Sequence, residues 1–122
     1  MAHTLRVENI TISTANTNTN GTGTIAALVT GTNQGTRVDY VVVKAIANVT
    51  AGMIRLFTKE NGGSWVLLAE LPVTATTGNA FTPFWTSPYR IPAIYLGHNQ
   101  QLGASTNNAE SFTVTAMCAD LQ

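Results

Sequence analysis

The chain has 122 residues, of which 44% are apolar and only 10% are charged, and its six basic and six acidic side chains cancel. Because an ordinary soluble domain carries about 25% charged residues, this composition predicts one weakly charged folded domain over residues 1–122 and excludes a disordered tail. So few cations exclude the basic surface that duplex nucleic acid and anionic lipid require, and the single cysteine excludes an intramolecular disulfide and a multi-cysteine zinc site.

Threonine and asparagine take the place of charge. The sequence holds 20 Thr and 11 Asn against 2 Lys. Threonine suits the pleated, half-buried surface of a strand and asparagine suits turns, so the composition favours an all-β fold. Lys44 interrupts the longest apolar stretch, which leaves it too short for a membrane span, and the first residues show no signal-peptide apolar core. We expect a soluble, non-secreted protein or one released by cell lysis, with no nucleic-acid or membrane partner.

The N-terminal region is predicted to hold one strand and one polar loop. A strand at residues 4–13 carries Leu5 and Val7 on one face and two later isoleucines on the other. This change of face predicts a β-bulge near residues 8–9. The following run, ANTNTNGTG, contains no apolar anchor. Residues 1–20 are therefore expected to be an N-terminal strand or arm that leads into a flexible loop.

Turn signals divide the rest of the chain into short strands. Seven further strands are expected at residues 24–31, 37–49, 53–59, 64–73, 80–89, 100–105 and 111–119. The run TNQG at residues 32–35 predicts a turn, and Asn61-Gly62-Gly63 predicts a tight hairpin, because asparagine and glycine accept positive φ.

Two of these elements carry further signals. Pro83 and Pro88 cannot donate ladder hydrogen bonds, so the strand at 80–89 is expected to be an edge strand or broken. The segment at 91–99 is expected to be a connection. The last strand alternates cleanly and places Cys118 on its apolar face. Eight turn-bounded strands predict an eight-stranded antiparallel sandwich or barrel.

Three strands carry apolar residues on both faces, which an antiparallel sheet with one wet face avoids. Val42 shows this in the strand at 37–49, and the strands at 53–59 and 64–73 repeat it. Either loops of the same chain cover the outer face, or a second subunit does; neutral charge also favours association. Because an arginine is rarely sealed in a core, the outer face is the one that holds Arg55. The predicted subunit interface of a homo-oligomer is then Met53, Arg55, Phe57, Trp65 and Leu67.

Two cations and one aromatic cluster leave alternatives open. Arg55 and Lys44 lie inside apolar strands, where each either crosses an interface to a carboxylate or covers apolar surface with its stem. For Arg55 the expected carboxylate is Glu70 or Glu60. The cluster either stacks on sugar rings of a partner or plugs one end of the sandwich, and it consists of Phe81, Phe84, Trp85 and Tyr89.

The sequence offers no constellation for catalysis. Its two histidines are His3 at the start and His98 in a predicted loop, and none of the common nucleophile, phosphate-loop or zinc motifs occurs. Cys118 is either a reactive thiol or, on an apolar strand face, a small buried hydrophobe. We expect no enzyme, no metal and no cofactor.

Three stretches together resemble a known group of proteins. They are GTRVDYVVVKAIANVTAGMIRLFT at residues 35–58, LLAELPVTATT at 67–77 and LGASTNNAESFTVTAMCADL at 102–121. In this order they are similar to small structural proteins of tailed bacteriophages, in which Gly-Thr-Arg precedes a long strand and an Asn-Ala-Glu turn precedes the last one. The resemblance covers about two-thirds of the chain and does not include the first 34 residues.

The resemblance implies a jelly-roll-like sandwich that decorates or cements a phage head. Such a protein is made in the host cytoplasm, forms a homotrimer, and binds the major capsid protein on the outer surface of the virion, where it stabilises capsomer junctions. The resemblance carries over no catalytic residue. The alternative function is a tail or fibre module that binds a host glycan or protein through the aromatic cluster or the threonine- and asparagine-rich loops.

Overall fold

The all-β prediction is confirmed by the computed structural model of the protein, which describes residues 3–87 and 93–122. Within these ranges the chain forms eight strands and no helix. The strands are β1 (His3–Ile12), β2 (Ala26–Thr30), β3 (Thr36–Ala45), β4 (Gly52–Lys59), β5 (Trp65–Val73), β6 (Ile94–Leu96), β7 (Gln101–Thr106) and β8 (Phe112–Leu121).

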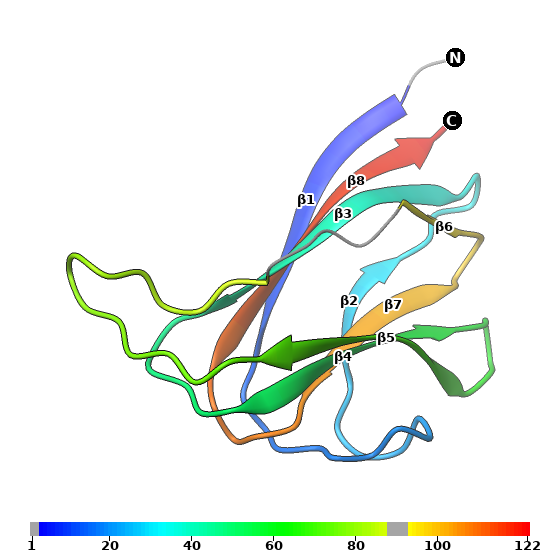
Figure 1. Ribbon diagram of the computed structural model, residues 1–122. Coiled ribbons are helices and arrows are strands. Elements are labelled where there is room, and N and C mark those ends of the chain that lie inside the picture. Colours follow the sequence, from blue (N-terminus) through cyan, green and yellow to red (C-terminus); the bar gives the residue numbers. More distant parts are fainter. Residues whose placement is uncertain (1–2, 88–92) are drawn as a thin grey trace.

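The strands form two four-stranded sheets that pack face to face as a sandwich (Figure 1). Sheet A has the order β1-β8-β3-β6 and sheet B has the order β2-β7-β4-β5, and all pairings are antiparallel. Because β1 lies beside β8, His3 is opposite Leu121 and the two ends of the described chain are neighbours. Among the described strands, only β4 and β5 are consecutive and pair with each other, so most of the fold depends on long-range contacts.

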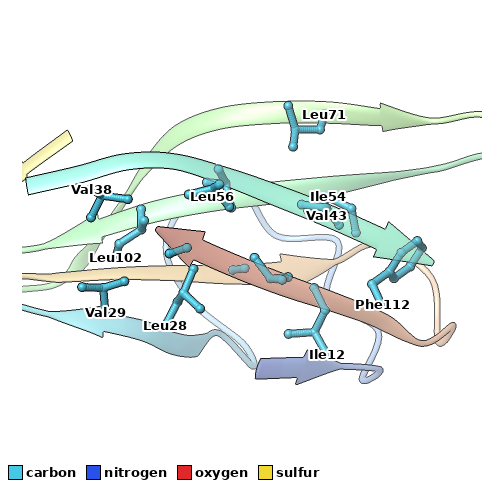
Figure 2. Close-up of a cluster of buried hydrophobic side chains, with 14 of the residues drawn as sticks. Ile12, Leu28, Val29, Val38, Val43, Ile54, Leu56, Leu71, Leu102 and Phe112 are labelled. Atoms are coloured by element: carbon cyan, nitrogen blue, oxygen red, sulfur yellow. The ribbon is translucent and has the colours of Figure 1, made fainter. Parts of the chain in front are cut away.

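The core lies between the sheets and follows the period of two that strands impose. In β8 every second residue from Phe112 to Cys118 is buried, as the alternation predicts. Opposite it, Ile54 and Leu56 of β4 are fully buried against side chains from both sheets (Figure 2). Trp85 closes one part of the core with its ring edge-on to Phe112, at 5.8 Å between centroids.

Both predicted turns are present. Gly62 has a φ of 76°, and the Gly63 N–H donates to the Glu60 carbonyl at 2.9 Å, so the loop at 60–64 closes the β4–β5 hairpin. The turn at 32–35 is closed by the Gly35 N–H, which donates to the Thr32 carbonyl at 3.0 Å.

Three details of the strand prediction are wrong. The pairing of β1 with β8 has no register shift, so the bulge near residues 8–9 does not exist. Residues 80–87 form no strand and contribute only an isolated bridge between Thr86 and Lys44, because Pro83 interrupts the ladder. The sixth strand lies instead at β6, inside the expected connection, where it pairs with the first residues of β3. The third strand ends at Ala45, four residues early.

Candidate interaction surface

The predicted face assignment in sheet B is correct. Arg55 and Phe57 of β4 point away from the core, because Ile54 and Leu56 fill it. A register shift in β5 then places Trp65 and Leu67 on the same outer face, opposite Lys59 and Phe57. The Trp65 ring lies over Gly103 of β7, where an added Cβ would be 2.7 Å from the ring.

This outer face is already covered by the chain itself. Phe57 is 0% exposed although it is not part of the core between the sheets, and Arg55 is also buried. Trp65 and Leu67 are half-buried, as is Met53. Within the single chain, two of the five residues of the predicted subunit interface are therefore buried and three are half-buried.

The loop at 13–25 runs towards this face and is held in place near its start and at its tip. The Asn16 N–H donates to the Thr106 carbonyl at the end of β7, at 2.8 Å. At the loop tip, Gly21 packs on the Trp65 backbone, where an added Cβ would be 2.1 Å from the carbonyl oxygen. The buried Asn16 side chain donates to the carbonyls of Thr22 and Thr24, at 3.1 and 2.9 Å. The loop lacks an apolar anchor, as expected, but a buried amide organises it.

Arg55 finds its carboxylate within the same chain. It lies directly opposite Glu70 in the β4–β5 ladder, and its Nε donates to Glu70 Oε2 at 3.0 Å. Its Nη1 donates to Asn107 Oδ1 at 3.2 Å. The partner residue was predicted, but the pair stabilises the subunit instead of crossing an interface.

Exposed apolar side chains lie on both sheets, on Val66 and Leu68 of β5 in sheet B and on Leu5 and Val7 of β1 in sheet A. Leu5 is 77% exposed and Val7 is 56% exposed, both on the outer face of β1. In the register of sheet A, Val7 is opposite Met117, and Met117 is opposite Tyr40. These side chains line a groove of about 430 Å³. We call Leu5, Val7, Tyr40 and Met117 the sheet A patch. A contiguous apolar surface of this kind marks an interaction site more often than single exposed residues do.

The sheet A patch exists because β1 turns its charged residues inward. Arg6 lies at the end of the sandwich, where its Nε donates to Asp120 Oδ1 at 3.0 Å and its Nη2 donates to the Thr30 carbonyl at 3.1 Å. Burial alone would lower the pKa of Arg6, but the hydrogen bond and the charge of Asp120 outweigh burial and raise the pKa. Glu8 also faces inward, as an ion pair to Arg6 at 3.2 Å. Leu5 and Val7 are then left facing outward without any bulge.

The aromatic cluster divides into two parts. Trp85 is buried and Phe84 packs against the core, so these two plug the sandwich. Phe81 is 97% exposed in the loop after β5. This loop projects from one end of the sandwich (Figure 1). The Asn79 side chain shapes this loop, since its Oδ1 accepts from the N–H groups of Phe81 and Thr82 at 2.8 and 2.9 Å. Tyr89 lies outside the described residues.

The other residues considered for function are Lys44, Cys118 and the two histidines. Lys44 Nζ donates to the Phe84 carbonyl at 2.6 Å and so ties the projecting loop to β3. Cys118 is buried, and burial raises the pKa of its thiol, against the opposing charge of Arg6. His3 and His98 are exposed. Over residues 3–87 and 93–122, no three histidine, cysteine, aspartate or glutamate side chains gather as metal ligands would.

No family model matches the chain, and no curated protein matches it. In the part of the chain that the structure describes, no helix has the length and apolarity to cross a membrane.

Proposed function

We propose that the protein is a virion structural protein that decorates the head of a tailed bacteriophage and stabilises its capsomer junctions. The sheet A patch carries this proposal, because it gathers exposed apolar side chains along one groove. The assignment to a phage structural protein comes from the resemblance at residues 35–58, 67–77 and 102–121.

The strand order supports the jelly-roll part of the proposal. Strand 1 pairs with strand 8, 2 with 7, 3 with 6, and 4 with 5. A long hairpin rolled into two sheets gives this set of pairs, which is the arrangement of a double Greek-key jelly roll. The stretches that carry the resemblance supply the four inner strands of the two sheets, β3, β4, β7 and β8, and most of the edge strand β5.

The sheet A patch is the proposed contact between copies of this chain. Leu5 and Val7 are both exposed and lie with Tyr40 and Met117 along one groove, which favours this surface for association. The number of copies, three, comes from the resemblance alone. A trimer that touches several capsomers binds more tightly than one subunit, because each contact raises the effective concentration of the next.

Copy number in purified particles tests the decoration function. A decoration protein is expected at a stoichiometry comparable with that of the major capsid protein, measured by quantitative gel or mass spectrometry. A few copies per particle would contradict decoration and favour the tail or fibre alternative.

A matched pair of variants tests the contact surface. Val7→Lys places a charge in the sheet A patch, whereas Val66→Lys places one on an equally accessible strand valine outside it. Light scattering should show that Val7→Lys lowers the oligomer mass and that Val66→Lys does not. A wild-type monomer in solution, together with unchanged particle binding by Val7→Lys, would exclude the patch as the contact.

One observation favours the alternative function, a tail or fibre module that binds a host glycan or protein. Phe81 is almost completely exposed on a projecting loop that is internally hydrogen-bonded. Aromatic side chains presented in this way stack on sugars or insert into protein pockets. Under this alternative, Phe81→Ala abolishes adsorption to host cells and leaves particle assembly intact. Under the decoration proposal, it leaves adsorption unchanged.

A further inference from the structure

The chain contains two Asn-Gly pairs, Asn20-Gly21 and Asn61-Gly62, which the sequence alone does not distinguish. We propose that Asn61 is a site of spontaneous deamidation in the folded protein and that the fold protects Asn20. This modification is independent of the proposed function, because it depends only on the surroundings of the two asparagines.

The reaction needs no enzyme and no co-reactant except water. The backbone nitrogen of the glycine attacks Cγ of the preceding asparagine side chain, a new C–N bond closes a five-membered succinimide, and the Cγ–Nδ2 bond breaks. The side-chain nitrogen leaves as ammonia and takes the proton that the glycine nitrogen loses. Water then opens either carbonyl of the ring and gives aspartate or isoaspartate. A following glycine favours the reaction because it has no side chain to hinder ring closure.

The surroundings of Asn61 leave both reacting groups accessible. Asn61 and Gly62 are exposed at the tip of the β4–β5 hairpin, and nothing lies within 4 Å of the position that a Gly62 Cβ would take. Among the described residues, neither the Asn61 side chain nor the Gly62 N–H has a hydrogen-bond partner; the turn is closed by Gly63 instead. The side chain can therefore rotate towards the Gly62 nitrogen without breaking a contact.

The surroundings of Asn20 oppose the same movement. Its Oδ1 accepts from both the backbone N–H and the hydroxyl of Thr22, at 3.2 and 2.6 Å. Gly21 is half-buried against the Trp65 backbone, so its nitrogen cannot shift towards Cγ until the loop leaves sheet B. Asn20 must wait for local opening, which slows a reaction by the free energy of that opening.

Deamidation would change the hairpin and the charge of the molecule. It adds one carboxylate to a chain whose formal net charge is zero. The new charge lies beside Glu60, whose Oε2 accepts from Gln100 Nε2 at 2.8 Å. The isoaspartate product also adds a methylene to the backbone of the turn that joins β4 and β5.

The test compares the two sites in one molecule. Purified protein is held in a mildly alkaline buffer, digested at acidic pH, and the two peptides are followed by mass spectrometry for the gain that replaces an amide with a carboxyl. In folded protein Asn61 should react at least about tenfold faster than Asn20, which corresponds to about 1.4 kcal/mol of protection at Asn20. In urea the two rates should converge, because both asparagines then precede an unrestrained glycine.

Two variants complete the design. Asn61→Gln should remove the fast phase, because glutamine would have to close a larger ring. Asn16→Ala removes the hydrogen bonds that hold the loop, so it should accelerate Asn20 alone. Equal rates for the two sites in the folded protein, or a faster Asn20, would overturn the proposal. If Asn16→Ala does not fold, the comparison of folded and urea-treated wild type still decides the matter.

Discussion

At the scale of single residues, two glycines adopt a positive φ for different reasons. Gly62 has a φ of 76° in open space at a hairpin tip, and Gly21 has a φ of 86° against the backbone of Trp65. Only the first belongs to a local pattern, because the Asn-Gly turn lies between two strands that pair with each other. The second depends on a contact between segments more than forty residues apart.

Replacement of Gly62 should measure the cost of holding a side-chain-bearing residue at positive φ, because an added Cβ there meets no other atom within 4 Å. Gly62→Val is expected to lower the free energy of unfolding by about 1 kcal/mol or more, because a β-branched residue resists positive φ. Gly62→Asn is the matched control and should cost less, since asparagine accepts this conformation. Chemical denaturation measures both. An unchanged midpoint for the valine variant would contradict the turn.

Among the elements, the polar loop at 13–25 packs against sheet B. Asn16 holds the loop together through hydrogen bonds to the carbonyls of Thr22 and Thr24 and joins it to Thr106, and Gly21 contacts the backbone of Trp65. The run at 15–23 makes these contacts without a large apolar side chain.

The contact between this loop and the Trp65 backbone can be tested with a pair of glycine variants. Gly21→Ala and Gly62→Ala introduce the same backbone strain, but only the first brings a Cβ within 2.1 Å of the Trp65 carbonyl oxygen. Gly21→Ala should therefore lower the free energy of unfolding more than Gly62→Ala and shift tryptophan fluorescence towards the exposed value. Equal costs, with unchanged fluorescence, would show that the loop contact contributes nothing.

Arg6 connects three strands at the end of the sandwich. It joins β1 to Asp120 of β8 and to the Thr30 carbonyl of β2, which belongs to the other sheet. Arg6→Met keeps the apolar stem but removes these bonds, so it should lower the free energy of unfolding by about 1–3 kcal/mol. Arg37→Met is the control, because the Arg37–Asp39 pair is shorter, at 2.8 Å, but more exposed, and exposed pairs contribute about 0–1 kcal/mol. Denaturant unfolding measures the free energy of unfolding of both variants. A similar decrease in both would contradict a special role for Arg6.

At the scale of the whole molecule, the topology joins distant parts of the sequence. His3 lies opposite Leu121, and Thr36 lies opposite Asp120, so sheet A is complete only when the two ends of the chain meet. The β4–β5 hairpin is the one pairing between consecutive strands among the described residues. Such a fold has a high contact order, which slows the search for native pairs.

Refolding is therefore expected on the millisecond-to-second scale typical of β-sandwiches. Stopped-flow fluorescence can follow it, because Trp65 reports the outer face of sheet B and Trp85 reports the core. Refolding within microseconds would contradict this account of the topology.

The outer faces of β4 and β1 illustrate what could be predicted about the surface from the sequence and what could not. The side of β4 that holds Arg55 and Phe57 was assigned correctly, because a period of two and one charged residue settle it locally. Within the single chain, Arg55 and Phe57 on this side are buried and Trp65 is half-buried. Leu5 and Val7 of β1 are exposed, and β1 pairs with β8 without the predicted bulge. Arg6 and Glu8 alternate with Leu5 and Val7 along β1, and they were the available signal for which way the strand faces. They could face inward only with a partner such as Asp120.

The all-β class, the turns at 32–35 and 60–64 and the burial of Cys118 could be predicted from the sequence, because each follows from φ preferences or side-chain alternation within a few residues. The position of the loop at 13–25 and that of the sixth strand could not. The loop is placed by a hydrogen bond from Asn16 to Thr106, and β6 is a three-residue strand that exists because β3 offers it a partner. Neither contact leaves a local pattern, since its energy arises only when residues far apart in the chain are brought together.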